Sequence, residues 1–191
     1  MLTVRRSQEK NGTIVAIDVD NLLISSARAG QKFEKYSLKS GFEKMFEWIQ
    51  SFGKILAVHF YMPSSQSKND ELWNGLWEKF CGQFQFFETV YCPKTRNETG
   101  KRADNVDCHL ISHTKQLITL FPGQVKYFCL ASGDLDYSSL LWELRRKEIE
   151  IAFALGSERS FSDAYRQMKI AAKHPATGDE LIYYFSPHKT A

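Results

Sequence analysis

Residues Val125 to Leu155, VKYFCLASGDLDYSSLLWELRRKEIEIAFAL, contain the pattern from which the fold can be predicted. It begins with an apolar run of strand-forming residues, turns at residues 132–136, continues with an amphipathic helical pattern and ends in a second apolar run at 149–155. Two buried strands joined by a helix are typical of a βαβ unit, whose strands lie parallel. The turn carries two carboxylates, Asp134 and Asp136, which either cap the helix or hold a ligand at the edge of the sheet.

The same alternation runs outward through the rest of the chain. Strand patterns lie at residues 13–18, 54–61 and 84–91, and helical patterns lie at 38–52, 70–81, 104–120, 137–147 and 161–172. Residues 92–102 are expected to form a polar loop, and residues 180–185 an edge strand. Because the strands are near-continuous apolar runs, helices should cover both faces of the sheet. The sequence therefore predicts an α/β fold: a three-layer α/β/α sandwich with a mainly parallel central sheet. We expect one domain at 11–186 with short tails at 1–10 and 187–191.

The overall composition limits the class of protein. The chain has 191 residues, of which 43% are hydrophobic, and this is typical of a globular protein. Its four cysteines form no C-x-x-C pair and are expected to be reduced thiols. The N-terminal apolar run, Ile14 to Ile17, is too short for a signal peptide, and no stretch approaches the roughly 20 apolar residues of a membrane span. These features predict a cytoplasmic protein.

Acidic residues gather where expected strands end or an expected helix begins. They form three clusters: Asp18 and Asp20, Asp104 and Asp107, and Asp134 and Asp136. In open parallel sheets, ligands bind outside the carboxyl ends of the strands, where the strand order reverses. Carboxylates gathered at that edge would repel one another, and a hard cation with oxygen ligands removes the conflict. The clusters therefore predict a Mg²⁺ or Mn²⁺ site.

Each cluster also has a simpler reading. Asp104 and Asp107 are three residues apart and would share one face of the expected helix, where they could serve only the helix dipole. Asp136 is expected to be the N-cap of the following helix, and Asp20 could face solvent. Asn21 is a candidate to orient a substrate phosphate or a metal-bound water.

Two further features bear on substrate binding. Ser132 is expected to donate its hydroxyl to a substrate from the strand-end turn. The expected loop before the third helix carries four basic residues, Lys94, Arg96, Lys101 and Arg102. Basic groups dominate sequence-independent affinity for nucleic acids, so these four are candidate contacts with a nucleic acid. A solvated surface loop is the alternative.

Three segments resemble the signature blocks of NYN domains, a family within the PIN-like nuclease superfamily that includes the LabA-like proteins of bacteria. They are IVAIDVDNLL (14–23), KRADNVDCHLISHTKQLI (101–118) and CLASGDLDYSSLLWELRRKEIEIAFAL (129–155). The chain departs from the pattern at Val19, where the family usually has Gly. The middle block usually reads Lys-x-Val-Asp, whereas this chain offers Asp104 or Asp107.

The resemblance implies a PIN-like, Rossmann-like sandwich and a metal-dependent ribonuclease that cleaves single-stranded or flexible RNA. It assigns Asp18, Asp104 and Asp134 as metal ligands, with Asp107 and Asp136 in support. Asp104 is favoured over Asp107 because it is expected to open the helix. A small domain without an attached RNA-binding module is expected to depend on a homodimer or a protein partner for specificity.

Two other functions compete with this one. The Asp18-x-Asp20 pair also resembles haloacid-dehalogenase-type phosphatases, in which Asp18 would be the nucleophile and Asp20 the general acid/base. Against it, Asn21 and Leu22 do not fit that pattern, and no expected second strand ends in Ser or Thr. The other alternative is a non-catalytic RNA-binding or protein-interaction module.

Overall fold

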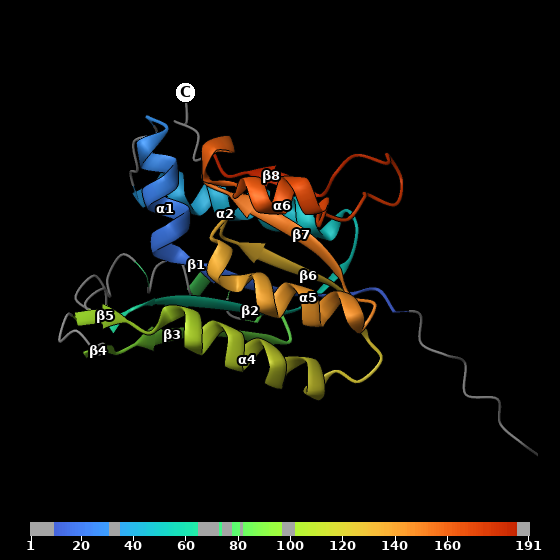
Figure 1. Cartoon of the computed structure of the whole chain (residues 1–191), viewed down its shortest axis with the longest axis horizontal. Helices are drawn as coiled ribbons and strands as arrows, with labels where there is room; N and C mark the ends of the chain where they lie inside the picture. The colour runs from blue at the N-terminus through green and yellow to red at the C-terminus, as the bar shows by residue number, and fades with distance from the viewer. Residues whose placement is uncertain are drawn as a thin grey trace, which may run out of the picture.

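The computed structural model describes residues 10–30, 35–64, 73, 78–80, 82–96 and 102–186; at 35–37, 94–96 and 102–104 it describes the backbone alone. A six-stranded parallel sheet forms the centre, in the order β3-β2-β1-β6-β7-β8 (Figure 1). The strands are β1 (Gly12–Asp18), β2 (Lys54–Pro63), β3 (Phe86–Cys92), β6 (Val125–Ala131), β7 (Glu150–Leu155) and β8 (Ile182–Tyr184). The fold is the expected α/β sandwich with a parallel sheet.

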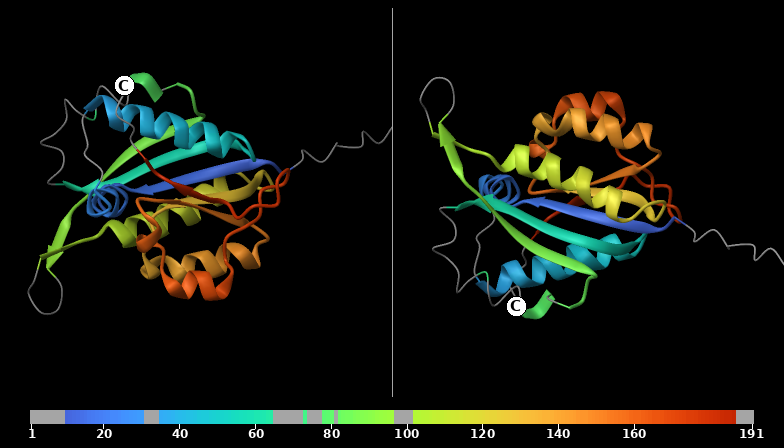
Figure 2. Two further views of the ribbon diagram at one scale, coloured as in Figure 1. Left: turned by 90° about the horizontal axis from the view of Figure 1, so that it is seen from above. Right: turned by 90° about the horizontal axis from the view of Figure 1, so that it is seen from below.

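Helices cover both faces of the sheet (Figure 2). One face packs against α1 (Val19–Arg28) and α2 (Lys35–Gln50), and the other against α4 (Val106–Leu120), α5 (Ser138–Arg146) and α6 (Asp163–Met168). Alternate residues of β1 supply the two cores: Val15 and Ile17 face α2, whereas Ile14 and Ala16 face α4. This two-residue period buries both faces of the strand and explains the continuous apolar run. Within the described residues, every helix lacks the length or the hydrophobicity needed to cross a bilayer.

The sequence reading missed α1. Asp18 caps this helix by accepting a hydrogen bond from the backbone N–H of Asn21 at 3.1 Å. Its buried residues, Val19, Leu22 and Ser26, recur at helical spacing. Val19 and Leu22 are apolar, but the helix has only ten residues and follows β1 without a break, so its pattern was not distinguished from the end of the strand.

The region before α4 also differs from the prediction. Residues 92–102 are not wholly a loop, because β4 (Lys94–Arg96) and β5 (Arg102–Asp104) form an antiparallel hairpin that projects from the body of the sheet (Figure 2). The helix begins at Val106, so the prediction that Asp104 opens it is wrong, and Asp104 and Asp107 do not share a helix face.

Two other helices are shorter than predicted. A 3₁₀ turn at Leu135–Tyr137 precedes α5. The prediction of a long helix at 161–172 is wrong. The helix α6 ends at Met168, where Lys169 adopts a left-handed conformation with φ of 47°. Beyond it the chain runs extended, and Ala171 pairs with Ile151 of β7. Of the helix expected at 70–81, Trp73 and residues 78–80 are helical and the remainder lies outside the described residues.

Candidate functional site

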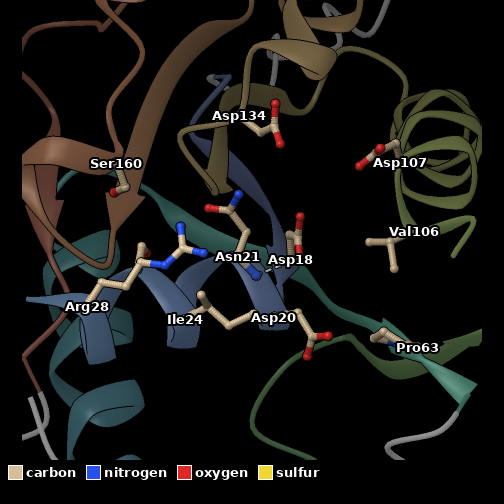
Figure 3. Close-up of a pocket in the computed structure, with 11 residues that line it drawn as sticks. Asp18, Asp20, Asn21, Ile24, Arg28, Pro63, Val106, Asp107, Asp134 and Ser160 are labelled. Atoms are coloured by element: carbon tan, nitrogen blue, oxygen red, sulfur yellow. Dashed lines mark hydrogen bonds between the residues drawn. The ribbon is translucent and has the colours of Figure 1, made fainter. Parts of the chain in front are cut away.

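The strand order reverses between β1 and β6, which lie side by side with Ile17 opposite Ala131. At the carboxyl ends of these strands there is an open cavity of about 480 Å³. Four carboxylates line it, those of Asp18, Asp20, Asp107 and Asp134 (Figure 3). They come from the end of β1, the start of α1, the first turn of α4 and the turn after β6. This crevice is the ligand-binding position expected for an open parallel sheet.

Asp18 is the most buried of these carboxylates, with 7% of its surface exposed. Its Oδ1 accepts the hydrogen bond from the Asn21 N–H, and its Oδ2 accepts one from the hydroxyl of Tyr137 at 2.9 Å. Burial raises the pKa of Asp18 to about 6; the two hydrogen bonds lower it, and the nearby charges of Asp107 and Asp20 raise it further. Each carboxylate oxygen keeps a second lone pair, so Asp18 can still accept a cation.

The Tyr137 hydroxyl lies between two carboxylates. It donates to Asp18 and also interacts with the side chain of Asp107. Burial, first of all, and then these two carboxylates raise the pKa of Tyr137 far above the usual range, so the phenol stays neutral. A phenol can donate one hydrogen bond, and here Asp18 accepts it. Tyr137 was not among the predicted site residues; the signal was a hydroxyl-bearing aromatic directly after the acidic turn.

Asp134 shapes the turn after β6 as well as lining the cavity. Its Oδ1 accepts a hydrogen bond from the backbone N–H of Asp136 at 3.2 Å, so Asp134 caps the 3₁₀ turn. The prediction that Asp136 is the N-cap is therefore wrong; its side chain is exposed and Tyr137 occupies the N-cap position of α5. Ser132 is buried, and its hydroxyl accepts a hydrogen bond from the Asp134 N–H, so it supports the turn from inside.

The structure places the other predicted residues as follows. Asn21 lines the cavity, half-buried, at the start of α1. Asp104 ends β5, and Lys94, Arg96 and Arg102 lie on the hairpin, all with side chains outside the described part. Lys101 also lies outside the described residues. Whether the basic residues reach RNA stays a prediction.

The donor set suits a hard cation. Among the described residues, no three His, Cys, Asp or Glu side chains lie close enough together to enclose a metal ion. Mg²⁺ does not need such a cage, because it usually keeps several waters and binds through one or two carboxylates. Asp18 and Asp107 supply oxygen ligands beside one phenol. Burial is the main cause of the raised pKa of Asp18, and a bound cation would stabilise the ionised carboxylate there. The residues therefore fit a hydrated Mg²⁺ or Mn²⁺.

The pKa of Asp18 predicts a pH-dependent stability. Because this pKa is about 6 when folded and near 3.8 ordinarily, the folded state binds the proton more tightly. The ionised Asp18 carboxylate therefore destabilises the folded protein above pH 6, and this destabilisation disappears as the pH falls toward 4. In EDTA, the difference in free energy of unfolding between Asp18→Asn and wild type should be large at pH 7.5 and shrink at pH 5. Urea titrations at both pH values measure it, and a pH-independent difference would contradict the assignment.

Tyr137→Phe removes only the hydroxyl that donates to Asp18. Since this bond lowers the pKa of Asp18, its loss should raise that pKa above 6. In EDTA, we expect the pH range over which the free energy of unfolding falls to extend to higher pH, with about 1–2 kcal/mol of stability lost with the hydrogen bond. Tyr184→Phe, which removes an exposed hydroxyl on β8, is the matched control. Urea titrations across pH in EDTA measure this range, and an unchanged pH dependence in Tyr137→Phe would show that the phenol does not act on Asp18.

Comparison with known proteins agrees with the resemblance seen in the sequence. The family model described as NYN domain matches residues 12–171, from the start of β1 to the extended segment after α6. No curated protein and no solved structure matches the chain significantly. The finer resemblance to LabA-like proteins stays a prediction.

Proposed function

Since the chain belongs to the NYN domain family, a part of the PIN-like nuclease superfamily, we propose that it is a metal-dependent endoribonuclease that cleaves single-stranded or flexible RNA. One observation supports this most: the buried carboxylate of Asp18 shares a cavity with Asp107 and Asp134 at the switch point of the sheet. PIN-like nucleases generally use divalent metal ions, and oxygen ligands of this kind are those that Mg²⁺ and Mn²⁺ prefer.

Asp18 and Asp107 would hold the hydrated metal ion directly, and Asp134 would contact it through its bound waters. Asp104 stays an alternative to Asp107. We prefer Asp107 because its side chain lines the cavity and interacts with the same phenol as Asp18. When bound, the ion would offset the charge of the carboxylates and of a phosphodiester under attack.

The remaining residues position these groups or the RNA. Tyr137 fixes the orientation of Asp18 through their hydrogen bond. The amide of Asn21 is open to the cavity and can contact a phosphate oxygen. Asp136 supports the turn through its backbone N–H. The four basic residues on and beside the β4–β5 hairpin stay candidates for contacts with RNA farther along the strand.

A panel of substrates separates this proposal from its rivals. The wild-type protein with Mn²⁺ is incubated with labelled single-stranded RNA, with the same sequence in a duplex, and with a phosphomonoester such as para-nitrophenyl phosphate. We expect internal cleavage of the single strand, slower cleavage of the duplex and no phosphate release from the monoester. Hydrolysis of the monoester with intact RNA would favour the phosphatase alternative, with Asp18 as nucleophile. If the protein acts on none of the three substrates but still binds RNA, the non-catalytic binding module would be favoured.

A further inference from the structure

The acidic cavity continues into a second hollow of about 660 Å³. The two adjoin, because both are lined by Ser25, Arg28 and Ser160. The second hollow lies between the C-terminal half of α1 and the 3₁₀ turn at Glu158–Ser160, which follows β7, and Arg159 lies at its far side. Together they form a groove, here called the α1 groove, that leads from the carboxylates toward two arginines.

The walls of the α1 groove are held close together. A Cβ atom at Gly156 would lie 2.0 Å from Ser25 Oγ and 2.3 Å from the carbonyl oxygen of Leu22, so the end of β7 packs directly on α1. The hydroxyl of Ser160 donates to the carbonyl of Ser157 at 2.7 Å and closes the turn opposite. The groove is therefore built from backbone that cannot easily shift.

The α1 groove carries two arginines besides its acidic residues. Arg28 lines both hollows, and Arg159 and Glu158 line the second. In the described part of the chain, neither Arg28 nor Arg159 forms an ion pair, and both are exposed. Arg28 extends beside α1 toward Asn21 (Figure 3). The nearest acidic side chain of this turn, Glu158, instead faces Arg166, whose guanidinium lies 3.8 Å from its carboxylate and donates to its carbonyl at 2.7 Å.

We propose that the α1 groove binds the phosphodiester backbone of single-stranded RNA next to the cleavage position, with Arg28 and Arg159 each contacting a phosphate. This inference rests on the proposed function for the identity of the strand. The guanidinium group matches a phosphate with two parallel hydrogen bonds, and proteins that bind single strands follow the backbone with a positive groove. Ile24, an exposed apolar side chain at the wall of the acidic cavity, offers a surface for a base.

The charges that line the α1 groove indicate where the phosphates of the RNA would bind. Carboxylates repel a phosphate unless a cation lies between them, whereas the arginines attract one directly. The groove thus offers two kinds of phosphate position: one at the carboxylates, which needs a metal ion, and one at the arginines, which does not. Binding without divalent ions should depend on the arginines.

Fluorescence anisotropy tests this with a labelled 12-nucleotide single-stranded RNA in EDTA, at several salt concentrations. We expect Arg28→Gln and Arg159→Gln each to weaken binding by about three- to tenfold and to reduce the slope of log K against log salt by about 0.7. In cleavage assays with Mn²⁺ the loss should appear as a raised KM. Arg146→Gln, at the exposed end of α5 and outside the groove, is the control and should bind as wild type does.

The outcomes separate the groove from the proposed activity. If both arginine variants bind RNA with the affinity and the salt dependence of the wild type, the proposal that RNA binds in the α1 groove is overturned, even if the protein cleaves RNA. A wild-type protein that binds no single-stranded RNA would also overturn it. Arginine-dependent binding by a protein that cleaves nothing would support the groove and refute the nuclease.

Discussion

Replacing Asp18 with Asn is expected to lower the rate of RNA cleavage at least about a hundredfold and, without divalent ions, to stabilise the protein. Stabilising charge at the reacting phosphate with a metal ion contributes several kcal/mol, and about 2.7 kcal/mol corresponds to a hundredfold in rate. Asn has nearly the same shape as Asp but lacks the negative charge. The Asn21 N–H can still donate to its oxygen, and the Tyr137 hydroxyl can turn to accept from its amide.

The gain in stability follows from the pKa of Asp18. A carboxyl with a pKa near 6 in the folded state and 3.8 ordinarily costs roughly 3 kcal/mol at pH 7.5 when ionised. Asn does not carry this cost, so the urea midpoint in EDTA should rise. Asp163→Asn, an exposed aspartate on α6, is the control for removing one negative charge. Retained cleavage in Asp18→Asn would contradict the assigned role, as would a destabilised protein.

Replacing Gly133 with Ala is expected to destabilise the fold by about 3 kcal/mol or more. A Cβ atom here would lie 1.9 Å from the carbonyl oxygen of Ser160 and 3.1 Å from the Cα of Phe161. Both are backbone atoms, so no side chain can rotate away to make room. The turn after β6 would have to move, and Asp134 with it, so cleavage should fall together with the urea midpoint.

Gly123→Ala serves as the comparison. Gly123 has a left-handed φ of 71°, and nothing lies within 4 Å of a Cβ placed there. Ala at this position should cost about 1 kcal/mol, through the backbone alone. Equal urea midpoints for the two variants would show that the turn after β6 tolerates a side chain and is not fixed by contact with Ser160.

The central strands could be predicted because a strand that is buried on both faces consists of a nearly continuous run of apolar residues. The strand expected at 125–131 has those bounds, and the end of β1 at Asp18 was also correct. The short helices were harder to predict. The helix α1 has an apolar face formed by Val19, Leu22 and Leu23, but it has only ten residues and directly follows β1. The Asp104 error has a similar cause, since three-residue strands such as β5 give too little periodicity to separate them from a helix start.

The candidate site was predictable only where the topology determines position. Parallel strands bring their carboxyl ends to one edge, and this rule alone placed Asp18 and Asp134 together. The hydrogen bond from Tyr137 to Asp18 joins residues 119 positions apart and depends on side-chain geometry that no local pattern encodes. Arg28 and Arg159 line one hollow, and this too depends on long-range packing, that of Gly156 on α1.

The dependence of RNA cleavage on a divalent metal ion is the property to measure first. End-labelled single-stranded RNA is incubated with the wild-type protein in Mn²⁺, in Mg²⁺ and in EDTA, and the fragments are separated on a denaturing gel. The account predicts internal fragments with either ion, none in EDTA, and restored cleavage when excess Mn²⁺ is added back. Equal cleavage in EDTA would contradict it, as would intact RNA in all three conditions.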